Sequence, residues 1–448
     1  MVEPDLNSSR IPDSTPRWHV WGCFILMLVG LYLILGPKVN LSAWNVTPDA
    51  NAAFEEALSW RKGTLALGRD FGEDVHVNGK QYNAVGLAFV FLSYAGTVLS
   101  DWLAAYSGWQ DSPHAPLHPA IFVIMVALPL PVLGYWAFRC VRTPPPWAAV
   151  LTVYLIAGTS LRPVLSRAGG GSIYQLNHVL AVSGLLLIAG DLLGRRRIWP
   201  ALVGLALAAW SRQMTCLYAI PVLGLAWDSR KRPAPVLQTT SAVRGEPSEG
   251  DVPPPRIPRR RIPGRFVLAL IGVAVIAAVP MTLNAIKFGS PFNTGYFQLY
   301  EGRLDKIAID AHSQFYGPRH LLRHAKAMFW AYPKWDIRGG QLYPVTTDIE
   351  GGSIWLTSPL LLAIFPTALC WWRDRQARAL LLSSFLVMIA VMGYHTTGAQ
   401  EEGFYRYSLD FIPVWLVVIA PFVATRRWMP FTLACLAYSL LYFNIIPP

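Results

Sequence analysis

Long apolar runs recur along this chain from Trp18 to the C-terminus, and no other feature limits its fold as strongly. Each run is about 17 to 25 residues long, which is the length that crosses a bilayer as an α-helix. Charged residues make up 14% of the chain, whereas a soluble domain carries about 25%. The sequence therefore predicts an all-α, polytopic integral membrane protein of about 11 transmembrane helices, with juxtamembrane helices in its outer loops.

The charge pattern sets the expected topology. The net charge is +12, but the basic residues gather in short connections between apolar runs and in one linker, so the positive-inside rule explains them and we expect no nucleic-acid partner. The segment 84–106 is ambiguous. If it crossed the membrane, Arg139 and Arg142 would fall outside, whereas at the outer interface it leaves every later basic joint inside. We therefore place it at the interface. The expected spans are 18–36, 119–139, 147–162, 178–194, 198–212, 213–227, 264–284, 354–372, 378–395, 407–424 and 428–446.

Four parts follow one another in this scheme. They are a disordered cytoplasmic tail (1–17), an N-terminal transmembrane module (18–227) with a first outer loop at 37–83, a basic, Pro-rich cytoplasmic linker (228–263), and a C-terminal transmembrane module (264–448) with a large outer loop at 285–353. The outer loops hold most of the Asp, Glu and His residues, so function is expected at the extracytoplasmic boundary. The five cysteines show no metal-binding or disulfide spacing.

The first outer loop begins with a predicted helix. Thr47 is a natural N-cap, and Pro48 suits the first helical position. On such a helix Asp49 and Glu56 lie within roughly 20° of each other, which gives one face two carboxylates. A transferase needs one carboxylate as general base. The alternative is that Asp49 only complements the helix dipole.

Further polar residues follow in the same loop. Asp70, Asp74, His76 and Lys80 supply carboxylates and bases, but their spacing is not distinctive of a metal site. Solvated loop residues are the plainer interpretation, and we predict no metal ligands, although a divalent cation stays an open alternative. In the second large loop, residues 318–332 predict an interfacial helix with one apolar side.

Three arginines lie at the outer ends of predicted spans: Arg167, Arg212 and Arg406. A charge at that depth is costly unless it is paired or solvated, so each is a candidate for binding an anionic head group. The alternatives are snorkelling for Arg212 and an i+4 pair with Asp410 for Arg406. His395 is most simply an interfacial histidine. His178 and Asp191 could line a polar pocket but are too far apart on one helix to pair with each other.

Several stretches, in order along the chain, resemble a known superfamily. They are 48–50 after the first span, 74–86 with its Gly79-Lys80-Gln81-Tyr82 core, 208–212 ending in an arginine, 288–296, 352–360 and Tyr405-Arg406-Tyr407. Together they resemble the GT-C polyprenyl-phosphate-dependent glycosyltransferases, above all bacterial proteins related to protein O-mannosyltransferases and lipid A aminoarabinose transferases. The likeness covers nearly the whole chain except the 228–263 linker. Where relatives often have Asp-Glu, this chain has Asp49-Ala50.

The resemblance implies an activity and roles for single residues. It implies inverting transfer of a sugar from a polyprenyl-phosphate donor to an extracytoplasmic acceptor, which could be a protein, a lipid or a glycan, in the bacterial plasma membrane with the N-terminus in the cytoplasm. Asp49 would be the catalytic base. The donor phosphate and substrate would be held by Lys80, Arg212, Tyr405 and Arg406, with Glu56, Asp74 and His395 in support. The competing hypotheses are a multi-pass transporter or flippase, and a non-catalytic protein of the same fold.

Overall fold

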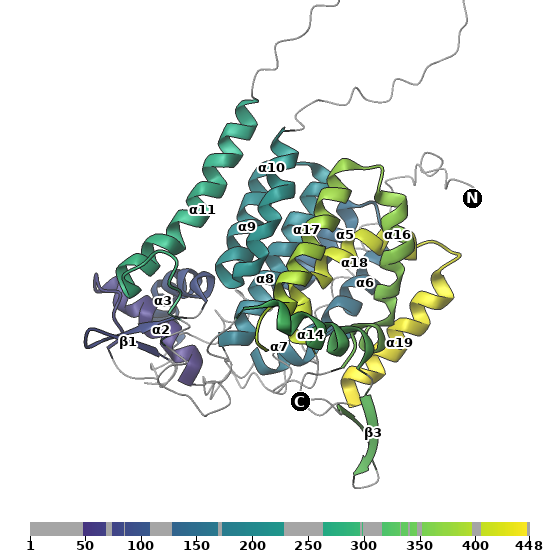
Figure 1. Cartoon of the computed structure of the whole chain (residues 1–448), viewed down its shortest axis with the longest axis horizontal. Coiled ribbons are helices and arrows are strands. Elements are labelled where there is room, and N and C mark those ends of the chain that lie inside the picture. Colours follow the sequence, from purple (N-terminus) through teal and green to yellow (C-terminus); the bar gives the residue numbers. More distant parts are fainter. Residues whose placement is uncertain are drawn as a thin grey trace, which may run out of the picture.

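The structure is a computed structural model. It describes residues 48–68, 74–84, 86–107, 128–168, 173–227, 263–295, 298, 316–331, 333–338, 341–346, 352–396 and 405–445. The predicted tail (1–17), the first predicted span (18–36) and all but the last residue of the predicted linker (228–262) lie outside these residues. The described part is mostly helical, and Figure 1 shows a bundle with α2, α3 and the hairpin that starts with β1 gathered at one side.

The bundle helices follow the predicted order. Their bounds are α5 Pro129–Cys140, α6 Pro145–Ala157, α7 Leu161–Ala168, α8 Ile173–Gly190 with the π-helical turn η2 Asp191–Arg195, α9 Ile198–Ser211, η3 Gln213–Tyr218, α10 Ala219–Trp227, α11 Gly264–Phe288, α14 Pro318–Trp330, α15 Ile354–Thr357, η4 Pro359–Ala363, α16 Ile364–Trp371, α17 Arg375–Met392, η5 Arg406–Asp410, α18 Ile412–Val423 and α19 Met429–Ile445. The first outer loop adds α2 Pro48–Arg61 and α3 Leu87–Ser107.

Helix α8 is the centre of the bundle, because it packs against α5, α7, α9 and α18 and is almost wholly buried. Its closest approach is to α9. A Cβ on Gly184 would lie 2.4 Å from the carbonyl oxygen of Gly204, so both helices need glycine at the crossing. Near the start of α8, Asn177 contacts Gly86, where a Cβ would lie 1.9 Å from Asn177 Nδ2. Gly86 also has a φ of +66°, which glycine adopts without strain. These contacts seat the first outer loop directly on α8.

Four helices in the described part of the chain are long and apolar enough to cross a membrane: α3, α8 with η2, α11 and α17. Six more apolar helices are shorter. Several predicted spans are therefore broken. The spans at 213–227, 354–372 and 407–424 each begin with a 3₁₀ turn or a short helix. Pro359 begins the 3₁₀ segment η4, and Pro413 lies in the first turn of α18. Segment 84–106, predicted at the outer interface, forms α3, whose length and composition suit a span.

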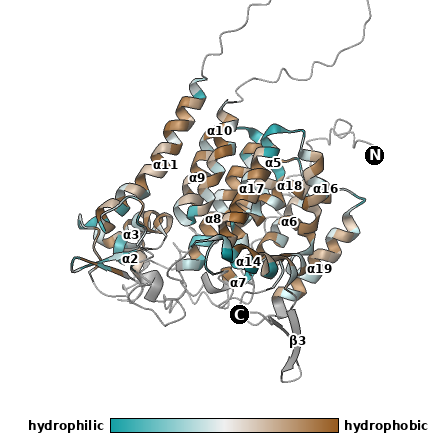
Figure 2. Cartoon of the chain, in the orientation of Figure 1, coloured by the Kyte–Doolittle hydropathy of each residue, from teal (hydrophilic) through white to brown (hydrophobic). Residues whose placement is uncertain are grey.

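Helix α11 leans away from the bundle, as Figure 1 shows. Only 6% of its most apolar window is buried, although that window has a mean hydropathy of 2.6. Val267, Ile271, Val275 and Ile286 are among its exposed side chains, and Figure 2 shows the helix brown along most of its length. So much exposed apolar surface on one helix is unfavourable in water. Lipid is therefore the natural environment of α11.

Two antiparallel hairpins correct the all-α prediction. The first pairs β1 (Asp74–Val77) with β2 (Lys80–Asn83). Its turn residues, Asn78 and Gly79, have φ values of 51° and 73°, as the Asn-Gly type I′ turn requires. The second pairs β3 (Pro333–Arg338) with β4 (Gln341–Thr346), across the sequence Gly339-Gly340. The sequence signals for these hairpins are the dipeptides Asn78-Gly79 and Gly339-Gly340. Such short signals are missed when the sequence is searched only for long apolar runs.

A buried ion pair fastens the first outer loop to α11. Glu56 on α2 is fully buried and pairs with Lys287 near the end of α11. Asn83 at the end of β2 donates to Glu56 Oε2 at 2.9 Å, and Lys287 Nζ donates to the Asn83 carbonyl at 3.1 Å. One carboxylate thus joins a helix, a hairpin and a lipid-facing span. Its burial is tolerable only because both oxygens are bonded.

We expect Lys287→Met to destabilise this junction by about 3–5 kcal/mol, because the substitution leaves Glu56 buried without its cation. Thermal unfolding in detergent, followed by the loss of a monodisperse peak on size exclusion, measures the effect. Lys62→Met, which changes an exposed lysine just after α2, is the matched control. The double variant Glu56→Met, Lys287→Met should recover most of the loss. A Lys287→Met protein as stable as the control would contradict the account.

The predicted topology has its own test. In a chain whose native cysteines are replaced by serine, His76→Cys on the exposed β1 strand should react with a membrane-impermeant thiol reagent added outside. Arg427→Cys, exposed between α18 and α19, should react only after the membrane is permeabilised, because basic joints stay inside. Labelling of both positions from the same side would overturn the topology.

Candidate functional site

Asp410 at the end of η5 is the anchor of a buried polar cluster. Its side chain is fully buried, and Arg212 approaches it as a two-pronged fork, with Nε 3.2 Å from Oδ1 and Nη2 3.2 Å from Oδ2. Arg212 can do so because α9 ends at Ser211 and Arg212 itself is extended. Tyr218 donates to the backbone carbonyl of Asp410 at 3.1 Å. The fork satisfies a charge that would otherwise be very costly inside the bundle.

Two guanidinium groups meet on the ring of Tyr407. Arg212 Cζ lies 4.4 Å from the ring centroid, and Arg406 Cζ lies 5.4 Å from it. Arg406 is 8% exposed, and the Arg212 side chain is 22% exposed. A tyrosine face attracts cations, so one ring brings together two positive charges that would otherwise repel each other. The sequence predicted both arginines for the same site, and the structure places them on one ring.

His178 on α8 packs against Tyr407 and Asp410 of this cluster. Its ring stacks on Tyr407 with centroids 5.7 Å apart, and its Nδ1 is 3.8 Å from Asp410 Oδ1. That separation is too long for a hydrogen bond. Asp191, the other residue of the expected polar pocket, lies at the opposite end of α8 and pairs with Arg197 at 3.1 Å. The two residues therefore serve separate ends of the bundle.

Helix α14 covers the cluster from the side of the large outer loop. Tyr316 just before it donates to the Ala390 carbonyl at 2.6 Å, and the Gly317 N–H donates to the Gly393 carbonyl at 3.0 Å. Burial raises the pKa of Tyr316 to about 12. These bonds hold the start of α14 against the end of α17, as Figure 1 shows for the two helices. The interfacial helix predicted at 318–332 is thus confirmed as a helix.

Histidines gather where α14 meets the bundle. His320 and His324 stack with centroids 5.9 Å apart, and the His324 ring stands edge-on to Tyr405 at 6.3 Å. Burial lowers the pKa of His324 to about 4, helped by the charge of Arg323, and burial likewise lowers the pKa of His395 to about 4. His395, predicted to support the site, therefore lies within electrostatic reach of this group.

Tyr405 is 1% exposed, and its hydroxyl has no hydrogen-bond partner among the described residues. Burial raises its pKa, so the group stays a neutral donor. It lies within electrostatic reach of Arg212 and Asp410. A buried hydroxyl without a partner is costly in an apolar core, so Tyr405 is suited to donating to a ligand.

The remaining predicted residues lie in the first outer loop. Asp49 stands in the first turn of α2, which begins at Pro48 as expected, but its side chain lies outside the described residues, as do the side chains of Asp74 and Arg167. Lys80 is exposed on β2, in the hairpin that Figure 1 draws beyond α2. Glu56 is committed to Lys287. The structure therefore brings together Arg212, Tyr405 and Arg406, and it assigns Glu56 to the junction with α11.

Sequence reasoning missed Lys287, His320 and His324, and it did not connect Asp410 with Arg212. A pair between Arg406 and Asp410 at i+4 was one alternative, whereas the two-pronged partner of Asp410 is Arg212. The η5 segment is a 3₁₀ turn, so i+4 spacing does not align these side chains. The i+4 pair His320 and His324 was a readable signal on a predicted helix. Within the described residues, no group of three or more His, Cys, Asp or Glu could hold a metal ion.

The chain resembles known proteins only distantly. No protein-family model matches the sequence, and a search of curated proteins finds no match. Among solved structures the chain is similar to the archaeal oligosaccharyltransferase AglB from Archaeoglobus fulgidus, in complex with an inhibitory peptide and a dolichol-phosphate. The identity is 14% and the TM-score 0.42, over 96% of this chain and 55% of that chain. This chain thus spans about half the length of AglB, and a likeness so distant carries no argument about activity.

The histidines predict a pH dependence of stability. An unfolded histidine has a pKa of about 6.5, whereas the folded values of His324 and His395 are about 4. As the pH falls below about 6.5 the unfolded chain binds protons first, so stability present at neutral pH is lost progressively down to about pH 4. We expect the melting temperature of His324→Gln to fall less steeply over this range than that of the parent chain. His76→Gln, an exposed change on β1, is the control, and equal slopes for all three proteins would contradict the interpretation.

Proposed function

We propose that this chain is a membrane glycosyltransferase of the GT-C type, which transfers a sugar from a polyprenyl-phosphate donor to an acceptor at the outer membrane surface. The observation that carries the proposal is the meeting of Arg212 and Arg406 on the ring of Tyr407. Paired guanidinium groups are suited to phosphate because each presents a planar fork of donors. The Tyr405 hydroxyl, which has no hydrogen-bond partner in the described part of the chain and lies within electrostatic reach of Arg212, adds a neutral donor.

The reaction follows from these assignments. The acceptor hydroxyl attacks the anomeric carbon of the sugar, on the face opposite the phosphate. The bond between that carbon and the phosphate oxygen breaks, and its electron pair leaves with the polyprenyl phosphate. Asp49 takes the proton of the acceptor hydroxyl as general base. Because attack and departure occur on opposite faces, the configuration of the sugar inverts.

The arginines would act on the leaving group. As the sugar–oxygen bond breaks, negative charge grows on the phosphate, and guanidinium groups already fixed in place stabilise it without reorganisation. The fork from Arg212 to Asp410 holds one of them in place. Tyr407 packs against both and restricts their movement. The scheme needs no metal ion.

The helix that carries Asp49 is connected to this cluster. Helix α2 packs against α8, and α8 packs against η5. One helix therefore separates the helix of the proposed base from the proposed phosphate site. Glu56 on the same helix is engaged by Lys287, so the role of base falls to Asp49. Lys80, Asp74 and His395 stay as proposed supporting residues.

We expect Asp49→Asn to lower glycosyl transfer by at least about 100-fold, because a positioned general base contributes about 10²–10⁴ in rate. Arg406→Gln should also abolish most transfer by weakening the hold on phosphate. The measurement is mass spectrometry of glycans and lipid-linked sugars in a deletion strain complemented with each variant. The amount of chain in the membrane should stay equal to the parent.

Asp101→Asn is the matched control, because Asp101 is a half-exposed carboxylate of the same module, paired with Arg61 on the outside of α3. It should leave transfer unchanged. Full transfer by Asp49→Asn would remove the proposed base. Passage of a lipid-linked sugar across sealed vesicles with no change in its covalent form would favour a flippase instead.

A further inference from the structure

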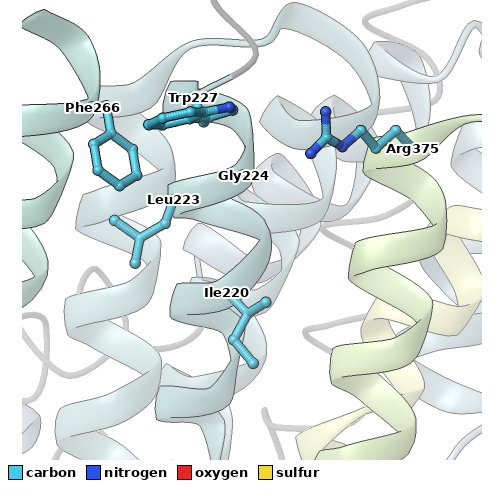
Figure 3. A pocket seen from close by; sticks show the side chains of 6 residues that line it. All are labelled: Ile220, Leu223, Gly224, Trp227, Phe266 and Arg375. Carbon is cyan, nitrogen blue, oxygen red and sulfur yellow. The ribbon is translucent and has the colours of Figure 1, made fainter. Parts of the chain in front are cut away.

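An apolar groove runs between α10, α11 and the start of α17, at the opposite end of the bundle from the arginine cluster. It is open and shallow, with a volume of about 440 Å³, and is lined by Ile220, Leu223, Gly224, Trp227, Phe266 and Arg375. Figure 3 shows Trp227 and Phe266 closing one wall and the Arg375 side chain reaching toward Trp227 from α17. The rings of Trp227 and Phe266 meet edge to face, with centroids 5.0 Å apart.

The groove has the walls of a lipid site. Two apolar side chains of the groove, Ile220 and Trp227, are half-exposed and therefore open to its surroundings. Helix α11, which contributes Phe266 to the far wall, is apolar, and only 6% of its most apolar window is buried. A channel between two such helices opens to the hydrocarbon of the bilayer. Trp227 stands at its rim, where tryptophan is favoured at membrane interfaces.

One cation stands at the rim. Arg375 is exposed, and within the described residues no carboxylate pairs with it. The neighbouring Asp374 is already engaged, because it caps α17 through the Gln376 and Ala377 N–H groups and accepts from Arg196 Nη2 at 3.2 Å. Arg375 is therefore available to an external anion.

The surroundings add to the positive charge. Arg373 and Arg378 flank Arg375, and Arg265 lies in the first turn of α11. The other described acid at this end, Asp191, is engaged by Arg197 at 3.1 Å. Basic side chains near a membrane surface attract anionic lipids, each by about 1 kcal/mol. The charge of this end thus complements an anionic head group.

We infer that this groove binds an anionic glycerophospholipid of the surrounding leaflet, with one acyl chain between α10 and α11 and the phosphate against Arg375. The site is separate from the proposed donor site. Helix α17 has 18 residues from Arg375 to Met392, so its two ends lie about 27 Å apart. The inference does not depend on the proposed glycosyl transfer.

The structure offers a matched pair of variants. Arg375→Gln removes the charge and leaves the apolar walls. Gly224→Leu fills the groove and leaves the charge, because a Cβ at this position meets only Gln376 Oε1, at 3.9 Å. Leucine also favours a helix more than glycine does, so the fold is preserved. Arg426→Gln removes an exposed arginine outside the groove and serves as the control.

The test is native mass spectrometry of the purified full chain in detergent, titrated with dioleoyl phosphatidylglycerol or with dioleoyl phosphatidylcholine. The parent should hold one phosphatidylglycerol more tightly than phosphatidylcholine. Arg375→Gln should weaken that first binding about fivefold, the equivalent of one interfacial charge, and remove the preference. Gly224→Leu should weaken binding of both lipids.

Two outcomes would overturn the inference. If Gly224→Leu binds both lipids as the parent does, no acyl chain occupies the groove, whether because the 228–263 segment fills it or because lipid binds elsewhere. If Arg375→Gln weakens phosphatidylglycerol binding no more than Arg426→Gln does, the preference comes from overall charge and not from this site.

Discussion

The fork between Arg212 and Asp410 is the interaction on which the site end of the bundle, where α9 meets η5, depends. Asp410 is fully buried among apolar helices, and a carboxylate there is tolerated only when a cation and further donors satisfy it. Arg212 can reach it only because α9 stops at Ser211 and the chain turns extended for one residue. The charge pair thus explains why a regular helix ends at that point.

The same constraint accounts for the broken helices around it. η3 follows Arg212, and η5 contains Asp410. Both are 3₁₀ segments, which leave backbone groups free to bond outside the helix. The carbonyl of Asp410 uses this freedom to accept from Tyr218. In an apolar environment such breaks occur where irregular backbone is buried in protein or lines a polar cavity. The disruption of three predicted spans therefore marks the part of the bundle where polar chemistry is expected.

The sequence predicted the helical scaffold well and the contacts of the site only in part. The apolar runs located α8, α9, α11, α17 and α19, because the length and composition of a segment decide whether it enters lipid. The sequence also selected Arg212 and Arg406, since a charge at that depth is costly unless it is paired or solvated. It could not predict that they meet on Tyr407, which depends on how α9 and η5 pack. The pairing of Asp410 with Arg212 was missed for the same reason, and the alternative partner, Arg406 at i+4, assumes a regular α-helix.

The first outer loop is a second case in which a contact between distant segments could not be predicted from the sequence. The sequence grouped Glu56 with Asp49 as a pair of carboxylates on one helix face, and helical geometry supports that grouping. What fixes the role of Glu56 is Lys287, which lies 231 residues further along the chain. No local pattern contains that information. This ion pair, with Asn83, ties the last turn of α11 to α2 and β2, and Gly289, in the left-handed region, caps the helix just beyond it. Asp49, whose backbone lies in the first turn of α2, stays the proposed base, and this role comes from the sequence resemblance.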